Sequence, residues 1–324
     1  MPQRVVITGG SGFLGRRISE SLREKGYIVH QMALPEEEVS GQFFKGDITD
    51  PDKFVFPEMD IVVHCAGLLE SSHPTEEMMM KVNHQGTVNV YREGLRRGMK
   101  KFIMISTISA MGPQGSKDRP MDERIEPRPD DPYGRSKLKA EKYLKERGLG
   151  DPVDITILRP TVLYGEGMNI HSSGMKTFTS IKKGIMPIVG RGDTIFNLLH
   201  VDNLVHAVVL SLERSEGVKT YIVSEGPYTL LHVVKTIEKA MGKKGHISVP
   251  KPVLWLLART FQVLSPLMKG PPPVSMVKYH GLTSDLWYVD GSKITRELGW
   301  KPVVSLEEGA VRTIGFYGLE VVKG

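Results

Sequence analysis

Short apolar runs alternate with amphipathic helical patterns through the first half of the chain. The apolar runs predict strands at 4–8, 27–32, 42–45, 61–65, 101–106 and 154–159. Helical patterns lie between them at 13–25, 76–98 and 133–147. This alternation predicts an α/β fold, a doubly wound parallel sheet with helices on both faces. The run 61–65 is apolar nearly throughout, as expected for a strand buried on both sides.

After Pro160 the pattern changes. Glycine and proline become frequent, and helical stretches follow at 202–214, 230–241, 251–268 and 305–319. We expect 1–160 to form the sheet domain and 161–324 to form mainly a smaller mixed lobe that caps it, with 195–224 returning to the sheet. The polar, proline-rich stretch 112–132 predicts an exposed loop that could serve as a lid.

The first strand runs directly into a glycine-rich turn, RVVITGGSGFLG, at residues 4–15. Gly9 lets the chain turn sharply, Gly12 lets the backbone approach a pyrophosphate, and Gly15 lets the following helix pack closely on the sheet. The phosphates then meet unpaired N–H groups at a helix N-terminus. A strand before the glycines and a helix after them predict a Rossmann dinucleotide-binding domain.

Composition limits the class of protein. The chain has 324 residues, 40% of them hydrophobic and 25% charged, which is typical of a globular protein. The single cysteine, Cys65, excludes an intrachain disulfide and favours a cytoplasmic location. The net charge of +6 comes without a basic run containing aromatic residues, so we expect no nucleic-acid partner. We also expect no signal peptide, no membrane-spanning segment and no metal site.

Tyr133 and Lys137 form a Tyr-x-x-x-Lys pair at the start of a helical pattern. A spacing of four places both side chains on one helical face. A tyrosine has a pKa of about 10, and a nearby ammonium lowers that pKa by favouring the phenolate. Lowering the pKa by about three units needs roughly 4 kcal/mol of interaction. We therefore expect Lys137 to activate Tyr133 as an acid/base.

Further polar residues lie where parallel strands end. Ser106 and Thr107 close the run 101–106, where a hydroxyl can either bond a substrate oxygen or cap a turn. Asn83 falls within a helical pattern, where asparagine is unfavourable, which suggests a polar role. Asp47 follows the third strand and either accepts from an adenine amine or caps the turn before Pro51.

Seven motifs occur in one order: TGGSGFLG, GDITDP, VVHCAG, NHQGT, the strand ending in Ser106-Thr107, YGRSK and LRPTVLYGEG. In this order the chain resembles the extended short-chain dehydrogenase/reductases, the NAD-dependent epimerase/dehydratase family, over nearly its whole length. The resemblance implies the catalytic residues Thr107, Tyr133, Lys137 and Asn83. It also implies a set of residues that bind the cofactor, NAD or NADP: Gly9, Gly12, Phe13, Leu14, Gly15, Asp47, Ile48, Ala66, Gly67, Tyr133, Lys137 and Pro160.

The choice between NAD and NADP stays open. The second strand lacks the Asp that usually bonds the ribose 2′-OH of NAD, and Ala33 stands near that place. Arg16, Arg17 and His30 could meet a 2′-phosphate, which weakly favours NADP. Acidic residues at 36–38 could swing back and favour NAD.

Departures from the family pattern reduce the number of reactions that we expect of this chain. Ile108 and Ser109 follow Thr107 where nucleotide-sugar dehydratases carry Asp-Glu, which argues against dehydration. Phe196 and Asn197 stand where sugar-nucleotide epimerases often place Arg-Asp, which removes a cationic partner of the diphosphate. Arg191 could substitute for it.

The apolar stretch 252–268, PVLWLLARTFQVLSPLM, resembles the 3β-hydroxysteroid and sterol dehydrogenase branch, in which the lobe forms an apolar pocket. The stretch either packs on the main domain or makes a weak contact with a membrane surface. The favoured function is interconversion of a secondary alcohol and a ketone on a small, fairly apolar, sterol-like molecule. The alternatives are a nucleotide-sugar 4-epimerase and, less favoured, a non-catalytic NAD(P)-binding sensor. A homodimer through helices 86–98 and 133–147 is expected from the same resemblance.

Overall fold

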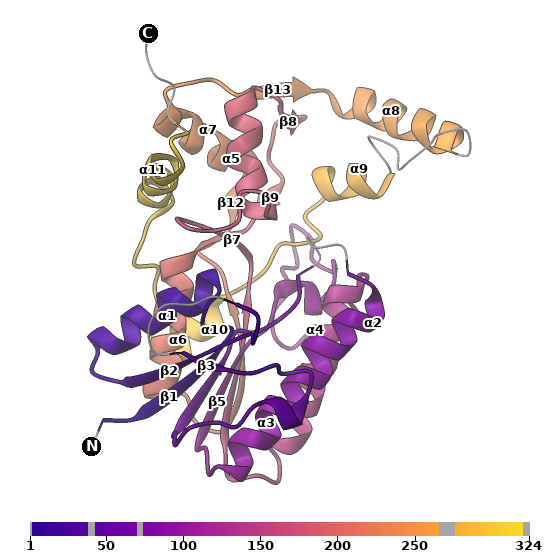
Figure 1. Cartoon of the computed structure of the whole chain (residues 1–324). Coiled ribbons are helices and arrows are strands. Elements are labelled where there is room, and N and C mark those ends of the chain that lie inside the picture. Colours follow the sequence, from indigo (N-terminus) through magenta and orange to yellow (C-terminus); the bar gives the residue numbers. More distant parts are fainter. Residues whose placement is uncertain (1, 38–42, 70–73, 266–275, 320–324) are drawn as a thin grey trace.

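The computed structural model describes residues 2–37, 43–69, 74–265 and 276–319. Its larger part is a parallel sheet of seven strands in the order β11-β6-β5-β4-β1-β2-β3 (Figure 1). The strands are β1 (Arg4–Thr8), β2 (Ile28–Ala33), β3 (Phe43–Lys45), β4 (Ile61–His64), β5 (Lys101–Ile105), β6 (Asp154–Pro160) and β11 (Val218–Val223). The chain therefore starts in the middle of the sheet and winds outward in both directions, as expected for a Rossmann fold.

Helices cover both faces of the sheet. One face carries α1 (Phe13–Glu24), α6 (Val201–Arg214) and α10 (Ser292–Leu298), and the other carries α3 (Gly86–Arg96) and α4 (Pro132–Arg147). Alternation along the strands explains the two layers, because Val5 and Ile7 lie in the first core and Val6 lies in the second. Both faces of the central strands are thus buried, which accounts for their unbroken apolar runs.

The predicted helix 76–98 is three pieces. It consists of α2 (Glu76–Met79), a π-helix (Met80–Gln85) and α3. A π-helical turn inserts one residue into the helical repeat, and such turns are frequent at functional sites. Asn83 lies inside this turn and is fully buried. The periodicity of the sequence could not distinguish it from an ordinary helix.

The smaller lobe has its own core. Its short strands are β7 (Val162–Tyr164), β8 (Met186–Val189), β9 (Ile195–Phe196), β10 (Leu198–His200), β12 (Tyr228–Thr229) and β13 (His246–Val249). Its helices are α5 (Ser173–Lys183), α7 (Leu230–Met241), α8 (Lys251–Leu264), α9 (Met276–Thr283) and α11 (Leu306–Tyr317). The core lies among α5, α7 and α11, with Phe178, Ile237 and Ile314 buried there.

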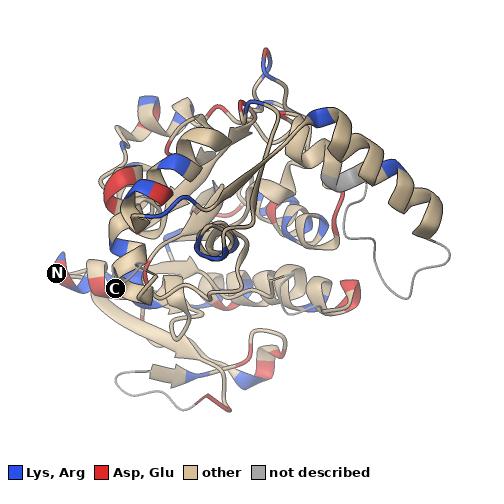
Figure 2. Ribbon diagram, turned by 90° about the horizontal axis from the view of Figure 1, so that it is seen from above, with Lys and Arg blue, Asp and Glu red and all other residues tan. Residues whose placement is uncertain are grey.

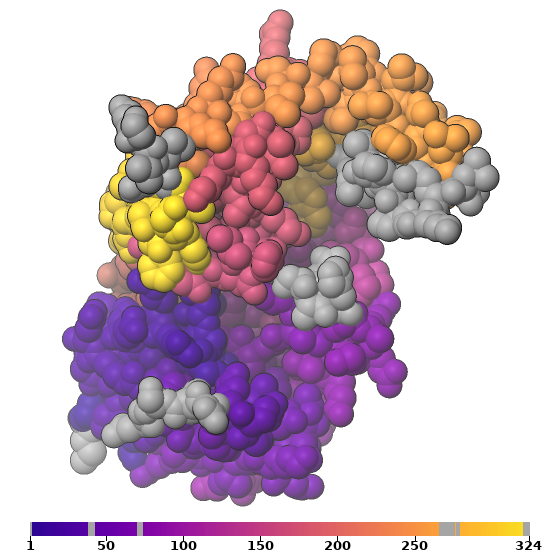
Figure 3. Space-filling model, turned by 45° about the horizontal axis from the view of Figure 1, so that its top comes forward, coloured from indigo at the N-terminus to yellow at the C-terminus, as the bar shows by residue number. Residues whose placement is uncertain are grey.

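The segment that returns to the sheet is shorter than the expected 195–224. Helix α6 and strand β11, within 201–223, belong to the sheet domain, whereas β9 and β10 pair with β12 and β7 in the lobe. Helix α8 begins where the pattern 251–268 predicts, and residues 266–268 lie outside the described part of the chain. Helix α5 was not predicted. Figure 3 shows the lobe seated on the sheet domain.

The stretch 112–132 is not a free lid. Gly115 N donates to Leu286 O at 2.7 Å, and Met121 exchanges backbone hydrogen bonds with Tyr288 O and Asp290 N. Met121 is fully buried. These contacts with 285–290 anchor the loop, and they were invisible in the sequence because the two segments are about 170 residues apart.

In the described residues, no helix has both the length and the apolar content needed to cross a bilayer.

A buried ion pair joins α4 to β6. The Arg159 guanidinium contacts the Glu141 carboxylate through Nε–Oε1 at 3.0 Å and Nη2–Oε2 at 2.5 Å, and both side chains are at most 1% exposed. Ser106 Oγ donates to the same carboxylate at 2.6 Å. The pair ties Tyr133's helix to the strands behind it.

We expect Glu141→Gln to lower the free energy of unfolding by about 3–5 kcal/mol, because it leaves a buried guanidinium without a counter-charge. The measurement is urea unfolding. The matched control is Asp122→Asn, which breaks the exposed pair with Arg124 and should cost less than about 1 kcal/mol. Equal losses in the two variants would contradict the assigned role.

Candidate active site

The glycine turn after β1 forms a cradle at the carboxyl edge of the sheet. Gly9 has φ +65°, and a Cβ added there would lie 2.8 Å from Ala66 N. A Cβ on Gly15 would lie 2.2 Å from Gly9 O. Gly12 is the N-cap of α1, and no side chain caps that helix in the described part of the chain. The open N-terminus, approachable through glycine backbone, fits the diphosphate of a dinucleotide.

The other expected cofactor residues follow several strands of the sheet or begin α1. Phe13 is half-buried, and its ring lies 3.4 Å from a Cβ built on Gly167, at the start of the lobe. Leu14 packs on the core beneath α1. Ile48 is buried against Gly86. Pro160 ends β6 beside Val223 of β11.

The Asp47 carboxylate stabilises the turn in which Asp47 lies. Its Oδ1 accepts from Thr49 N at 2.8 Å, and its backbone carbonyl accepts from Asp50 N at 3.1 Å. This geometry is an Asx turn, the structural role that the sequence left as one of two possibilities for this residue.

Helix α4 carries Tyr133 and Lys137. It starts at Pro132, because a proline suits the first helical position and Asp131 Oδ1 accepts from Gly134 N at 2.6 Å. One turn later, Lys137 is 3% exposed and its Nζ donates to Ile105 O, at the end of β5, at 3.0 Å. The helix thereby places a buried ammonium directly behind the sheet edge.

Thr107 faces Tyr133. It follows β5 in extended conformation and accepts a hydrogen bond from Ser109 N at 3.2 Å, which orients its hydroxyl. The Thr107 hydroxyl lies close enough to the Tyr133 hydroxyl to lower its pKa. The structure therefore brings Thr107, Tyr133 and Lys137 together from two different elements.

Burial determines the ionisation of this group. It raises the pKa of Tyr133 above its ordinary value, the Asp131 carboxylate acts in the same direction, and only the bond to Thr107 lowers it. Burial also lowers the pKa of Lys137 to about 8. The expectation that the pKa of Tyr133 is lowered is therefore not met in the free protein, where burial is the largest effect and Lys137 Nζ donates to Ile105 O.

Asn83 and Gly67 connect the two halves of the site. Asn83 Oδ1 accepts from Leu68 N at 2.7 Å, and its Nδ2 donates to Leu68 O and Ser136 Oγ, each at 3.0 Å. A Cβ added to Gly67 would lie 3.1 Å from both Asn83 Oδ1 and Lys137 Nζ. The loop 65–68 is therefore held between the glycine turn and α4, and Asn83 positions it.

A buried hydroxyl–imidazole chain lies beneath that loop. Thr87 Oγ1 donates to Asn83 O at 2.7 Å, so it must accept from His64 Nε2 at 2.9 Å. His64 Nδ1 then accepts from Thr8 Oγ1 at 2.7 Å. Burial lowers the pKa of His64 to about 3, so the ring is neutral.

The sequence analysis predicted neither this hydrogen-bonded chain nor the role of Glu141. The signal for Glu141 was its spacing of four from Lys137, which places it on the same helical face.

An acidic side chain reaches the glycine turn. Ser11 Oγ, in the glycine turn, donates to Glu37 Oε2 at 2.6 Å, and Leu34 N donates to the same oxygen at 3.2 Å. Glu37 thus swings back to the turn. Two of the three cations expected near a 2′-phosphate are placed elsewhere, because Arg17 pairs with Glu166 in the lobe and His30 lies within β2 near Arg4 and Arg23. Arg16 is exposed. The third residue of the acidic run, at 38, lies outside the described residues.

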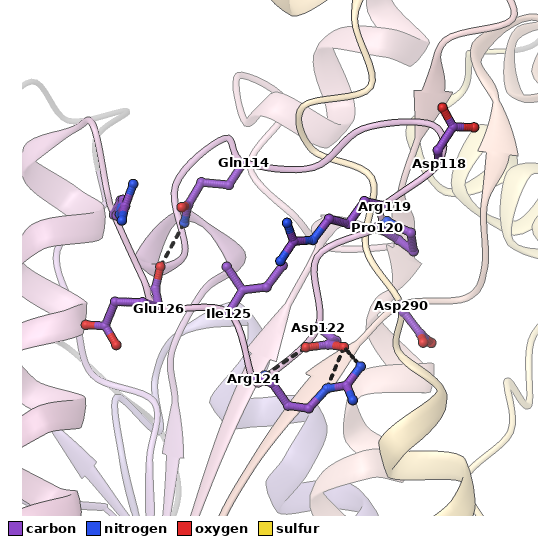
Figure 4. Close-up of a pocket in the computed structure, with 10 residues that line it drawn as sticks. Gln114, Asp118, Arg119, Pro120, Asp122, Arg124, Ile125, Glu126 and Asp290 are labelled. Atoms are coloured by element: carbon purple, nitrogen blue, oxygen red, sulfur yellow. Dashed lines mark hydrogen bonds and ion pairs between the residues drawn. The ribbon is translucent and has the colours of Figure 1, made fainter.

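A charged hollow of about 630 Å³ lies beside the site but not in it (Figure 4). It is lined by Gln114, Asp118, Arg119, Pro120, Asp122, Arg124, Ile125, Glu126, Arg128 and Asp290. Its floor is the anchored loop, in which Arg124 pairs with Asp122 and Gln114 donates to Glu126 O. None of the lining residues belongs to the Thr107–Tyr133–Lys137 group.

On the lobe side, Phe196 and Asn197 lie next to the anchored segment 285–290. Asn197 Nδ2 donates to Trp287 O at 2.7 Å, and Ile195 N donates to Asp285 Oδ1 at 2.6 Å. Phe196 is half-buried in the two-stranded sheet of β9 and β12. Asn197 is thus occupied in tethering 285–290.

Comparison with known proteins agrees with this geometry. The model of the NAD dependent epimerase/dehydratase family matches residues 5–224. The chain is 29% identical to UDP-glucose 4-epimerase of Vibrio cholerae, over 97% of this chain and 95% of that protein. It is 26% identical to 3 beta-hydroxysteroid dehydrogenase/Delta 5-->4-isomerase of Mycobacterium tuberculosis, over 97% and 90% respectively. The crystal structure of Thermotoga maritima UDP-glucose 4-epimerase with UDP-glucose shares the fold, with a TM-score of 0.75, 23% identity and coverage of 97% and 98%.

The buried Lys137 should make stability depend on pH. Between pH 8 and the ordinary lysine pKa of about 10.5, the unfolded chain binds a proton that the folded chain does not, so stability rises with pH across that window. Relative to Lys137→Met, we expect wild-type protein without cofactor to gain up to about 3 kcal/mol over this range. Urea unfolding at several pH values tests this. Lys139→Met, on the exposed side of α4, is the control and should track wild type; a flat difference for Lys137→Met would contradict the argument.

Proposed function

The chain belongs to the NAD-dependent epimerase/dehydratase family, and we propose that within it the protein is an oxidoreductase that interconverts a secondary alcohol and a ketone on a fairly apolar, sterol-like substrate. The observation that carries this proposal is the placement of the Thr107 and Tyr133 hydroxyls near each other, with buried Lys137 on the same helix, at the sheet edge that also holds the glycine turn. A non-catalytic sensor has no use for such a group.

Each residue has a defined role in this proposal. Thr107 holds the substrate oxygen by a hydrogen bond, and Tyr133 Oη takes the proton from the alcohol or returns it to the ketone. Lys137 supplies positive charge that favours the phenolate and donates to the ribose of the bound cofactor. The nicotinamide cofactor supplies the hydride acceptor and, when oxidised, a further positive charge. Because burial raises the pKa of Tyr133 in the free protein, we infer that the base forms only when the cofactor binds.

An apolar substrate is supported by the lobe. Phe196 stands where the epimerase pattern has a cation for a nucleotide diphosphate, and Asn197 is occupied by Trp287 O. A mycobacterial relative acts on hydroxysteroids by its name.

The second candidate is a nucleotide-sugar 4-epimerase, in which the same tyrosine serves a sugar hydroxyl. The 29% identity to the Vibrio cholerae epimerase favours it. The two candidates differ in one readout. A dehydrogenase leaves the cofactor reduced or oxidised after turnover, whereas an epimerase returns it to its starting state.

We further propose that the cofactor is NAD rather than NADP. The Glu37 carboxylate at the glycine turn can accept a hydrogen bond from a ribose 2′-OH and repels a 2′-phosphate. This revises the weak preference for NADP drawn from Arg16, Arg17 and His30, because Arg17 and His30 are placed elsewhere.

We expect Tyr133→Phe to lower kcat at least about 1,000-fold while leaving NAD affinity within a few-fold, because it removes the acid/base without touching the diphosphate cradle. Absorbance of the reduced nicotinamide, read across a panel of hydroxysteroids and sugar nucleotides, measures turnover. Thr107→Ser keeps the hydroxyl and should retain most activity, whereas Thr107→Val should not. Undiminished turnover in Tyr133→Phe would refute the assignment.

We expect Glu37→Ala to shift the ratio of NADP to NAD dissociation constants by about 10- to 100-fold toward NADP, the worth of one hydrogen bond to a charged group. Fluorescence titration of both cofactors measures it. Glu36→Ala removes an exposed neighbouring carboxylate and serves as the matched control. Equal shifts in both variants would mean that overall charge, not the Glu37 contact, sets the preference.

A further inference from the structure

The positive charge of this chain is concentrated in one stretch. Residues 239–284 contain no Asp or Glu and seven Lys or Arg residues. Since the whole chain has a net charge of +6, the remaining 278 residues carry a net charge of −1. The stretch comprises the end of α7, strand β13 and helices α8 and α9. The last acidic residue before it, Glu238, is already engaged by His246 and by Gly245 N.

Helix α8 exposes an apolar stripe within this stretch. Val253, Leu256 and Val263 are 48%, 61% and 76% exposed, and Leu257 and Leu264 are also exposed. These five positions follow the spacing of one helical face. A different face, with Leu254 and Ala258, is buried. The helix therefore anchors itself to the lobe with one part of its apolar surface and leaves the rest uncovered by the described residues. We define this stripe as the α8 stripe.

Cations flank the α8 stripe. Lys251 begins the helix and is exposed, and the Arg259 guanidinium lies 5.6 Å from the centre of the Trp255 ring. Lys244, just before β13, is exposed as well. Seen from above, the only charged positions on α8 are basic (Figure 2). The end of α7, β13 and α8 run along the edge of the lobe that lies farthest from the sheet domain (Figure 1).

We propose that the α8 stripe and its flanking cations form a peripheral docking surface for an anionic phospholipid bilayer. An apolar helical face beside Lys, Arg and Trp side chains is the chemistry that lies at the boundary between acyl chains and headgroups. Basic residues that outnumber the acidic ones around them are drawn to the negative surface potential of such a leaflet. The helix lies in the plane of the interface rather than crossing it, because its 14 residues are too few to span.

Charge selects the bilayer over a second copy of this chain. Two copies meeting through this edge would bring like charges together, with no acidic side chain from 239–284 to compensate. An anionic leaflet instead attracts the exposed cations Lys244 and Lys251. This inference does not depend on the proposed oxidoreductase activity, because it concerns a surface remote from Thr107 and Tyr133.

The test is co-sedimentation of the full chain with vesicles of phosphatidylcholine alone and of phosphatidylcholine mixed with phosphatidylserine. We expect binding to the mixed vesicles, at least about 10-fold weaker binding to phosphatidylcholine alone, and release as salt is raised. Leu256→Gln with Val263→Gln should weaken binding to the mixed vesicles at least about 10-fold. Lys244→Gln with Lys251→Gln should remove most of the preference for phosphatidylserine.

The matched control is Val55→Gln with Leu149→Gln. These residues are 55% and 88% exposed and lie on the sheet domain, so the pair removes similar apolar surface elsewhere. It should bind vesicles as wild type does. Absence of binding to the mixed vesicles, equal binding to both kinds of vesicle, or equal loss in the control pair would overturn the proposal. So would a dimer in solution that Leu256→Gln with Val263→Gln dissociates, because that result assigns the stripe to a second copy.

The fluorescence of Trp255 provides an independent measurement of vesicle binding. The Trp255 side chain is 44% exposed, whereas Trp300 is 2% exposed, so vesicle binding should shift its emission to shorter wavelength. Trp255→Phe should abolish most of that shift while sedimentation persists. A full shift in Trp255→Phe would place the contact elsewhere and refute the proposal.

Discussion

The site depends on the close approach of two backbone segments at the carboxyl edge of a parallel sheet. The turn at Gly9 lies so near the loop that begins at Ala66 that no Cβ fits between them. The Asn83 side chain then holds the next part of that loop, because it hydrogen-bonds to both the N–H and the C=O group of Leu68. The glycine turn and the Thr107–Tyr133–Lys137 group are therefore linked through this loop, and a displacement of either would move the other.

Desolvation governs the chemistry of this unit. An ammonium, a carboxylate and a guanidinium are buried within two turns of α4 and the adjoining strand: Lys137, Glu141 and Arg159. The last two neutralise each other, and Ser106 completes their hydrogen bonds. Burial lowers the pKa of Lys137, whose Nζ donates to a backbone carbonyl and contacts no carboxylate among the described residues. In the free protein, burial thus favours the neutral form of both Tyr133 and Lys137.

The lobe is joined to the dinucleotide domain by a cluster of charges near the glycine turn. Arg312 of α11 contacts Glu166 and Asp202, each at 2.6 Å, and these two carboxylates also pair with Arg17 of α1. Paired carboxylates raise the pKa of Arg312 above its ordinary value. Since Arg17 belongs to α1, the helix that follows the glycine turn, its side chain helps to position the lobe relative to that turn.

Local patterns in the sequence determined the Rossmann fold, the glycine cradle and the identity of the Tyr133–Lys137 pair, because strand alternation, turn glycines and helical spacing act over a few residues. Contacts between distant segments decided the rest. The anchoring of 112–132 by 285–290, the return of Glu37 to Ser11, and the reversal of the expected pKa shift at Tyr133 depend on burial and on partners far along the chain. Such contacts form only when the sheet places its strand ends side by side, and no short-range pattern encodes them.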